Sequence, residues 1–290
     1  MHGDLGAPKG FSFHRVGGVR ALVRNGDEAL LDPLAETLRS GVPLSGGDAT
    51  ALRGRGAVVS APIPGRPGER MVVRRYRHGG ALRIFGSLML LAAGRPFAEL
   101  RALAAAGEAG VPAARPIAAL SRGLAPGLSC GLLATAEEPG CVDLLEALRS
   151  RKLGRSERRA LSRGLARAVR RLHDAGIFHA DLHVKNVLVR KSSPDGGVVL
   201  VDFDRARVLG RPLPPRLRYR NLFRLDRSLE KTGLAPSRVS RADRIACLRA
   251  YLDPDVRRLA RAPGLKARLF WGRVGLAFHR LSWRLGGSPA

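Results

Sequence analysis

Lysine and negative charge are both scarce in this sequence. Six of its 51 basic residues are lysine and the rest are arginine, and 24 acidic residues leave a formal net charge of +27. A charge of this sign favours an anionic partner, such as nucleic acid, an anionic membrane face or a phosphorylated lipid. Aromatic residues make up only 5% of the chain, too few for base-stacking platforms, and the basic residues do not cluster in a tail. We therefore expect no nucleic-acid partner.

The sequence also has little cysteine and no long hydrophobic run. Its three cysteines, Cys130, Cys141 and Cys247, are far apart and odd in number. This argues against a disulfide framework or a zinc site and fits a reducing cytoplasm. The first residues lack the basic and apolar regions of a signal peptide. The most apolar segment, residues 84–93, has about half of the ~20 residues that a membrane span needs. These absences predict a cytoplasmic protein that is not integral to a membrane.

The most informative stretch is residues 179–207. It contains the pattern H-x-D-x-x-x-x-N, which places Asp181 and Asn186, and then a D-F pair that begins at Asp202. Between them lie two short apolar segments, predicted as a pair of strands joined by a polar turn. The pattern places two carboxylates and an amide at the ends of one hairpin. An isolated H-x-D is more often a turn, but the full spacing is typical of the phosphoryl-transfer loops of kinase-like enzymes.

The residue types in this stretch suit phosphoryl transfer. The reaction needs a positioned hydroxyl and divalent metal on the phosphates, with little covalent help from the protein. Asp181 can accept the proton of the hydroxyl and is the candidate catalytic base. Asn186 and Asp202 offer the oxygen ligands that Mg²⁺ prefers. We therefore expect ATP and Mg²⁺ as cofactors.

A small strand-rich lobe is predicted ahead of this stretch. Residues 51–59 read as strand, turn and strand, and residues 71–76 as a third strand. Gly54 and Gly56 lie where a loop over the phosphates belongs, although a plain hairpin explains them equally well. The third strand carries no lysine to bind the phosphates. Arg74 or Arg75 must supply that cation, and because side chains alternate along a strand only one can face the cleft; we favour Arg74.

A helix beginning at Arg95-Pro96 should carry the carboxylate that pairs with this cation, and Glu99 has that position. The alternative is a solvated surface glutamate. Residues 116–120 and 131–135 are predicted as the last strands of the small lobe, the second of which leads into a hinge that would contact adenine.

The second half of the chain is predicted to be helical. Helices are expected over residues 141–149, 156–173, with Ser156 as its cap, and 219–229. The fold class is therefore α+β, a two-lobed kinase-like fold with the active site between the lobes. We divide the chain into an N-terminal extension at 1–45, irregular before a helix near Pro33, a small lobe at 46–134 and a large lobe at 135–290. Residues 266–285 alternate cations with apolar residues, and form either a membrane-surface helix or a packing helix.

Two features bear on the acceptor. Position 183, two after the candidate base, is histidine, where kinases of serine and threonine usually carry lysine. No A-P-E triplet or long activation segment follows. Both features argue against a peptide substrate and favour a small molecule or a sugar.

Several segments resemble the bacterial Kdo kinase and lipopolysaccharide core heptose kinase family. Together they cover roughly residues 50 to 230: L-R-G-R-G-A at 52–57, V-R-R-Y-R-H-G-G at 73–80, F-A-E-L at 97–100, V-P at 111–112, R-P-I-A-A at 115–119, H-A-D-L-H at 179–183, D-F-D-R at 202–205, N-L at 221–222 and R-S-L at 227–229. The R-x-Y-x-x-G-G and D-F-D-R elements are the more specific ones.

The resemblance implies ATP-dependent phosphorylation of a Kdo or heptose hydroxyl on lipid A-linked core. It places the protein peripherally on the cytoplasmic face of the inner membrane. It implies Asp181 as base, Asn186 and Asp202 as Mg²⁺ ligands, and Glu99 with Arg74 as the phosphate anchor. The basic surface would then meet the phosphates and carboxylates of the inner core. Two alternatives stay open: a kinase of a soluble alcohol, and a non-catalytic basic module that binds membrane or nucleic acid.

Overall fold

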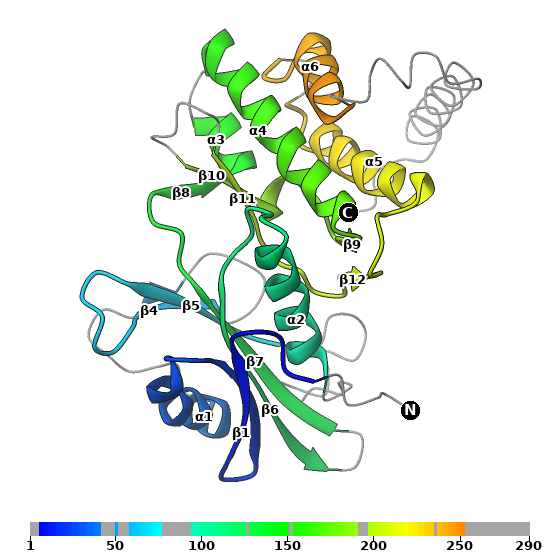
Figure 1. Ribbon diagram of the computed structural model, residues 1–290. Helices are drawn as coiled ribbons and strands as arrows, with labels where there is room; N and C mark the ends of the chain where they lie inside the picture. Colours follow the sequence, from blue (N-terminus) through cyan, green and yellow to red (C-terminus); the bar gives the residue numbers. More distant parts are fainter. Residues whose placement is uncertain are drawn as a thin grey trace.

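The chain forms two lobes (Figure 1). Residues of both lobes line a cleft between them. The computed structural model describes residues 6–41, 50–51, 58–76, 94–125, 128–150, 153–190, 197–234 and 237–252. The predicted α+β, two-lobed architecture is confirmed: one lobe is built on a sheet and the other on helices. None of the helices described is long and apolar enough to cross a membrane. Residues 54 and 56, 84–93 and 266–285, on which sequence predictions were made, lie outside the described residues.

The small lobe is built on a seven-stranded sheet in which every pair is antiparallel. The strand order is β1-β2-β6-β7-β5-β4-β3. The strands are β1 (Phe11–Val16), β2 (Val19–Arg24), β3 (Thr50–Ala51), β4 (Val58–Pro62), β5 (Arg70–Arg75), β6 (Pro116–Ala125) and β7 (Leu128–Ala136). The strands predicted from residues 51 to 135 are therefore present.

The expectation of irregular structure before the first helix is wrong. β1 and β2 form a hairpin, and β2 pairs with β6, so these residues extend the sheet of the small lobe. Tertiary pairing explains the difference, since β2 is buried against its neighbours although its turn is glycine-rich. The predicted helix near Pro33 is present as α1 (Leu31–Ser40), which follows the short 3-10 turn η1 (Glu28–Leu30) and ends at Gly41 in the left-handed conformation.

Helix α2 (Arg95–Glu108) packs on the sheet and carries the predicted Glu99. Its proline lies in the first turn, where a missing N–H costs no helical hydrogen bond. Gly131 on β7 permits the contact, because a Cβ at that position would lie 2.6 Å from Cγ of Pro96. The start of α2 is thereby held directly against β7, the last strand before the large lobe.

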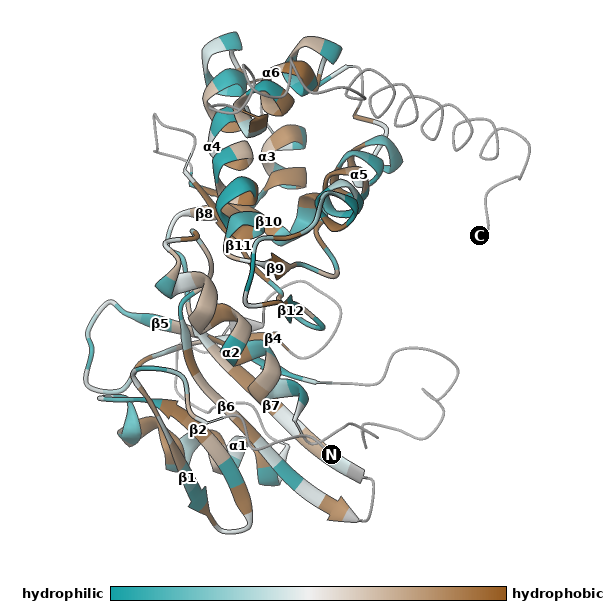
Figure 2. Cartoon of the chain, turned by 45° about the vertical axis from the view of Figure 1, so that its right-hand side comes forward, coloured by the Kyte–Doolittle hydropathy of each residue, from teal (hydrophilic) through white to brown (hydrophobic). Residues whose placement is uncertain are grey.

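The large lobe packs helices around a small sheet. Its sheet has the order β11-β10-β8, and a two-stranded ladder joins β9 to β12. The elements are β8 (Cys141–Asp143), α3 (Leu144–Ser150), α4 (Arg155–Asp174), β9 (Ile177–Phe178), η3 (Val184–Asn186), β10 (Val187–Arg190), β11 (Val198–Leu200), β12 (Arg207–Val208), α5 (Pro215–Lys231) and α6 (Arg241–Leu252). In Figure 2, α4 and α5 mix hydrophobic and hydrophilic segments, as amphipathic helices do.

Two details of this lobe differ from the sequence prediction. Residues 141–143 are a strand rather than the start of a helix, because they pair with β10. The cap of α4 is Gly154 rather than Ser156; the Glu157 carboxylate accepts the Gly154 N–H at 2.8 Å. The predicted strands at 187–189 and 198–201 and the helix at 219–229 are confirmed.

The lobes are joined by backbone hydrogen bonds close to the predicted site. Ala113, between α2 and β6, forms a parallel bridge with Leu200 at the end of β11. The Leu200 N–H donates to Pro112 O at 2.8 Å, and the Ala114 N–H donates to Leu200 O at 2.9 Å. Leu200 lies two residues before Asp202, so the small lobe is attached to the large lobe beside a predicted metal ligand.

Candidate active site

The loop that carries Asp181 is held by a buried histidine. Nδ1 of His179 accepts the backbone N–H of Asp181 at 3.2 Å, so the ring proton lies on Nε2, which donates to Val201 O at 3.1 Å. Burial lowers the pKa of His179, which keeps the ring neutral. The ring also packs on Phe203, with the centroids 4.9 Å apart. His179 therefore positions the loop against the segment that carries Asp202.

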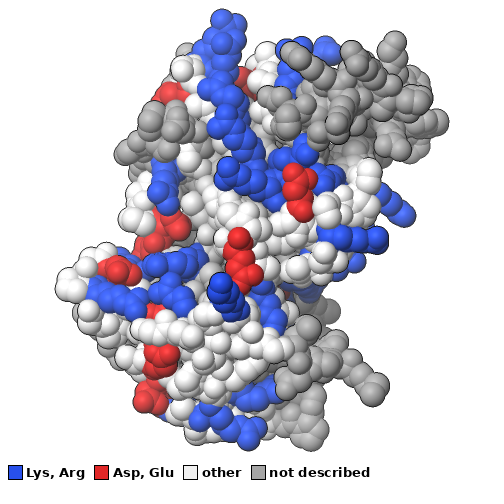
Figure 3. Space-filling view, viewed as in Figure 1, with Lys and Arg blue, Asp and Glu red and all other residues white. Residues whose placement is uncertain are grey.

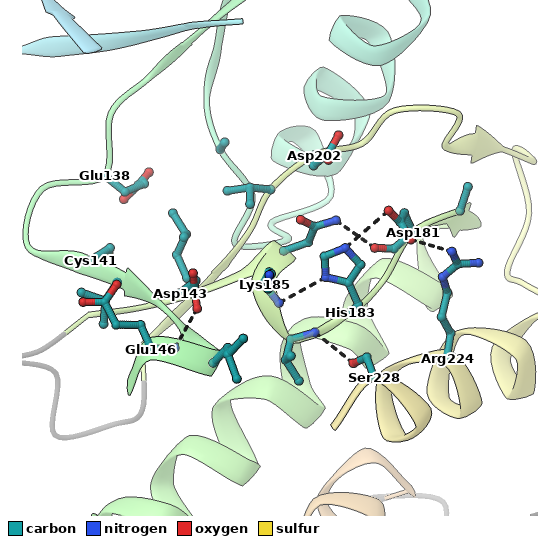
Figure 4. Close-up of a pocket in the computed structure, with 18 of the residues that line it drawn as sticks. Glu138, Cys141, Asp143, Glu146, Asp181, His183, Lys185, Asp202, Arg224 and Ser228 are labelled. Carbon is teal, nitrogen blue, oxygen red and sulfur yellow. Dashed lines mark hydrogen bonds and ion pairs between the residues drawn. The ribbon is translucent and has the colours of Figure 1, made fainter. Parts of the chain in front are cut away.

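Asp181 lies at the wall of the cleft and is partly exposed. Its Oδ1 accepts from Arg224 of α5 at 2.6 Å, and its Oδ2 lies 3.4 Å from Nε2 of His183 (Figure 4). Its backbone carbonyl accepts Nδ2 of Asn186 at 2.9 Å. This bond fixes the amide of Asn186, so that its oxygen is the atom left to face a ligand.

Asp202 follows β11 with a backbone that L-residues rarely adopt. Its φ is +62°, in the left-handed region. This turn takes the chain out of the strand direction and turns the carboxylate towards β5, where Oδ1 accepts from Nη1 of Arg74 at 2.5 Å. The structure thus brings together a predicted ligand and the predicted phosphate-binding cation, 128 residues apart in sequence.

Arg74 is the centre of a charged cluster. Besides Asp202 it contacts the carboxylate of Glu99, so the predicted pairing of α2 with the third predicted strand (β5) is present. Tyr76 donates its hydroxyl to Glu99, and its ring lies under the guanidinium of Arg74, 5.0 Å away, and of Arg95, 5.3 Å away. Arg75 points elsewhere and donates to Gly41 O at 2.8 Å. Of the two candidate arginines, Arg74 is therefore the one that faces the cleft.

The electrostatics of this cluster are those of a buried site. Burial raises the pKa of Glu99 to about 7, against the opposing effects of Arg74 and the Tyr76 hydroxyl. Burial alone would lower the pKa of Arg74, but Glu99 and Asp202 together raise it above its usual value, so the guanidinium stays charged. The pKa of Tyr76 is also raised, first by burial and then by Glu99. The cluster is a fixed cation with two carboxylates, one buried and one facing the cleft.

The cleft itself has a volume of about 1900 Å³. On the β8–α3 side it is lined by three carboxylates, Glu138, Asp143 and Glu146, and by Arg149; on the α5 side it is lined by cations, of which Figure 4 labels Arg224. Asn186 and Asp202 also line the cleft. An amide oxygen and a carboxylate are a donor set that fits Mg²⁺, which proteins commonly bind through one or two side chains, water and substrate phosphates.

Three site residues had no chemistry assigned from the sequence. Arg224 contacts Asp181, and Asp204 pairs with Arg95. Asn221 is fully buried; it donates to His179 O at 2.6 Å and accepts the His179 N–H at 3.3 Å. Asn221 and Asp204 do fall in the family-like segments N-L and D-F-D-R, but Arg224 stands in no such segment.

Comparisons with known proteins identify the family to which this chain is similar. Residues 52–251 match the model of the "Lipopolysaccharide kinase (Kdo/WaaP) family". A 3-deoxy-D-manno-octulosonic acid kinase of Xanthomonas campestris pv. campestris (strain B100) is 35% identical over 232 residues, covering 76% of this chain and 78% of that protein. One of Haemophilus influenzae (strain 86-028NP) is 29% identical over 189 residues, covering 62% and 74%.

A solved structure shows the same fold. It is described as WaaP in complex with acyl carrier protein, and it aligns with a TM-score of 0.59 over 88% of this chain and 97% of that chain, at 22% identity. The family match spans more than half of the chain and includes each described site residue discussed above. The chain therefore belongs to the lipopolysaccharide kinase (Kdo/WaaP) family, whose members are phosphotransferases.

Proposed function

We propose that this protein transfers a phosphoryl group from ATP to a hydroxyl of Kdo (3-deoxy-D-manno-octulosonic acid) in the lipid A-linked inner core, with Mg²⁺ as cofactor. The observation that carries the proposal is the convergence of Asp181, Asn186, Asp202 and the Arg74–Glu99 pair on one cleft. The relatives at 35% and 29% identity are named as kinases of this sugar acid.

Each residue has a role that follows from its position. Asp181 accepts the proton of the acceptor hydroxyl and orients the oxygen towards the nucleotide. Asn186 and Asp202 would hold Mg²⁺, which neutralises the phosphates when it is bound. Arg74 anchors the phosphates, and Glu99 holds Arg74 in place. The role of Gly54 and Gly56 as a phosphate-covering loop stays a prediction.

The apolar part of the cleft suits the adenine base. Val58, Val72 and Leu133 line it from β4, β5 and β7, and Leu188 lines it from β10. An apolar slot with a few polar groups is typical of sites that bind flat ligands. This arrangement supports ATP as the phosphoryl donor, with the base between the lobes and the phosphates towards Arg74.

The outer face of α4 supports a location on the inner-membrane surface. Arginines recur there at every fourth position, and all of them are exposed: Arg155, Arg159, Arg163, Arg167 and Arg171. Figure 3 shows lysine and arginine side chains in a column over this part of the large lobe. Like charges four apart destabilise a helix by roughly 0.2–0.5 kcal/mol per pair. An anionic bilayer would offset that cost, and co-sedimentation with phosphatidylglycerol but not phosphatidylcholine vesicles tests this location.

The test of the activity uses the purified chain with ATP, Mg²⁺ and Kdo-lipid A. Mass spectrometry of the lipid should show the addition of one phosphate. Asp181→Ala should abolish it, whereas Asp32→Asn, a change of an exposed aspartate on α1, should not. Transfer only to a heptose-containing core would show that the acceptor is heptose and not Kdo.

Two outcomes would contradict the proposal. Phosphorylation of soluble alcohols without any transfer to lipid would indicate a small-molecule kinase. Absence of both transfer and Mg²⁺-dependent ATP binding would indicate a non-catalytic module.

A further inference from the structure

The wall of the cleft that α5 forms is lined by cations. Arg220, Arg224, Arg227 and Lys231 all line the cleft, and their spacing places them on neighbouring turns of one helix face. This wall lies across the cleft from the acidic residues of β8 and α3 (Figure 4). Phosphates bound near Arg74 would not need it, so its charge requires another explanation.

One of these cations contacts the candidate base directly. Nη2 of Arg224 lies 2.6 Å from Oδ1 of Asp181, and their side chains are 53% and 42% exposed. An ion pair as exposed as this contributes little to folding stability. The contact is therefore poorly explained as a structural one.

The position of α5 is set by other residues. Asn221, one turn before Arg224, is buried and bonded to both backbone groups of His179. Ser228, one turn after Arg224, accepts the Val184 N–H at 3.1 Å through its Oγ. These two contacts hold the helix on the catalytic loop from either side. Arg224 lies between them and is left to serve a ligand.

We propose that Arg224, with Arg220 and Arg227 beside it, forms a subsite for the carboxylate of the acceptor sugar. This inference rests on the proposed function and adds the group by which the acceptor is recognised. A guanidinium matches a carboxylate with two parallel hydrogen bonds.

The contact with Asp181 also limits the distance between the two acceptor groups. Arg224 contacts Oδ1 of Asp181, the carboxylate that receives the hydroxyl proton. A carboxylate that binds the same guanidinium is therefore separated from Asp181 by no more than the width of that group. The carboxylate and the reacting hydroxyl therefore belong to the same sugar or to adjoining sugars. A Kdo residue meets this condition because it is itself a sugar acid. When the acceptor enters, its carboxylate competes with Asp181 for the guanidinium of Arg224, and Arg224 then holds that carboxylate beside the base while the base accepts the hydroxyl proton.

The experiment compares two soluble acceptors, one with and one without this charge. They are the methyl glycoside of Kdo as the free acid and as its methyl ester. Initial rates are measured for the wild type, Arg224→Gln and Arg224→Lys. Arg216→Gln is the matched control, because Arg216 is an exposed arginine of the same helix that does not line the cleft.

The wild type should prefer the acid. Arg224→Gln should lower kcat/KM for the acid roughly 10- to 100-fold, mostly through KM, as expected for loss of a charge-assisted pair. With the ester it should change kcat/KM less than about 3-fold, so the preference disappears. Arg224→Lys should retain part of the preference, and Arg216→Gln should retain all of it. An equal loss with both acceptors, or an unchanged preference in Arg224→Gln, would overturn the subsite.

Calorimetric titration separates this inference from the proposed function. If the wild type transfers phosphate to no Kdo acceptor but binds the acid, and Arg224→Gln abolishes that binding, the proposed reaction fails and the carboxylate subsite stands. If the acid binds neither protein, or binds both equally, the subsite fails whatever the reaction is.

Discussion

Arg95, the first residue of α2, holds both carboxylate oxygens of Asp204, two residues beyond Asp202. Its Nε lies 2.6 Å from Oδ1, and its Nη2 contacts Oδ2. Burial opposes ionisation of Asp204, but the hydrogen bond and charge of Arg95, together with nearby arginines, lower the pKa of Asp204 below its usual value. The pair joins the helix that carries Glu99 to the segment that carries Asp202, so two functional groups from different lobes are positioned by one contact.

A double-mutant cycle at this pair should show strong coupling. Arg95→Gln and Asp204→Asn should each lower kcat/KM for ATP by roughly 10- to 100-fold, because a charge-assisted bidentate contact is lost. The double variant should be no worse than the poorer single variant. Additive losses in the cycle would show that the two residues act independently.

Arg74→Ala should destabilise the protein. It leaves Glu99, whose side chain is only 2% exposed, without its cation, and breaking such a pair costs about 3 kcal/mol. Urea unfolding gives the stability, and titration with ATP should show weaker binding. Arg75→Ala is the matched control, since its guanidinium contacts the carbonyl of Gly41 outside this cluster. Equal stability of Arg74→Ala and wild type would contradict the prediction.

Asp202→Asn should separate nucleotide binding from metal binding. The amide oxygen can still accept from Arg74, so ATP binding without metal should change little. The gain in ATP affinity on adding Mg²⁺ should fall at least about 10-fold, because a hard cation loses a charged oxygen ligand. Fluorescence titrations with and without Mg²⁺ measure the affinity for ATP alone and the gain in that affinity on adding the metal. A full gain in the variant would remove Asp202 from the metal site.

Asn221→Ala should lower kcat with little change in KM for ATP. The side chain satisfies the N–H and the carbonyl of His179, and its loss leaves these buried groups unpaired at a cost of about 2 kcal/mol. Asn221→Asp keeps the hydrogen-bond acceptor and loses the donor, so its kcat should lie between those of Asn221→Ala and the wild type. Steady-state kinetics beside thermal unfolding would distinguish a loop displacement from general instability.

The folded state should weaken in mild acid because of His173. This residue is fully buried, and its Nδ1 and Nε2 lie 2.8 Å from the Tyr251 hydroxyl and 3.2 Å from Oδ1 of Asn221. Burial lowers its pKa from 6.5 to about 4. The unfolded chain therefore binds the proton first as the pH falls, and the stability contributed above pH 6.5 is lost towards pH 4.

The size of this effect is about 3 kcal/mol, from the difference in pKa. Denaturant unfolding between pH 7 and pH 4 measures it. Glutamine is uncharged at every pH. The His173→Gln variant should therefore be less stable than the wild type at pH 7, but its free energy of unfolding should fall less on acidification. A parallel decline in both proteins would assign the acid sensitivity to other groups.

Local sequence patterns predicted most of the helices and strands and identified the candidate base and metal ligands. Asp181, Asn186 and Asp202 are recognisable because their spacing is set by one loop and one hairpin. Arg74 was separable from Arg75 because side chains alternate on a strand. What local patterns missed depends on distant partners. Residues 141–143 are a strand only because β10 pairs with them, and Arg224 reaches Asp181 from 43 residues away.

The bridge between Ala113 and Leu200 restricts how the cleft can open. Backbone hydrogen bonds on both sides of Leu200 attach the small lobe at that point. The lobes therefore cannot separate as whole bodies without breaking the bonds; they can rotate about an axis near Leu200. Points close to that axis move least, so Asp202 keeps its place against Arg74 during such a rotation. Entry and exit of ligands would then occur at the far rim of the cleft, while Asp202 and the proposed metal site stay in place.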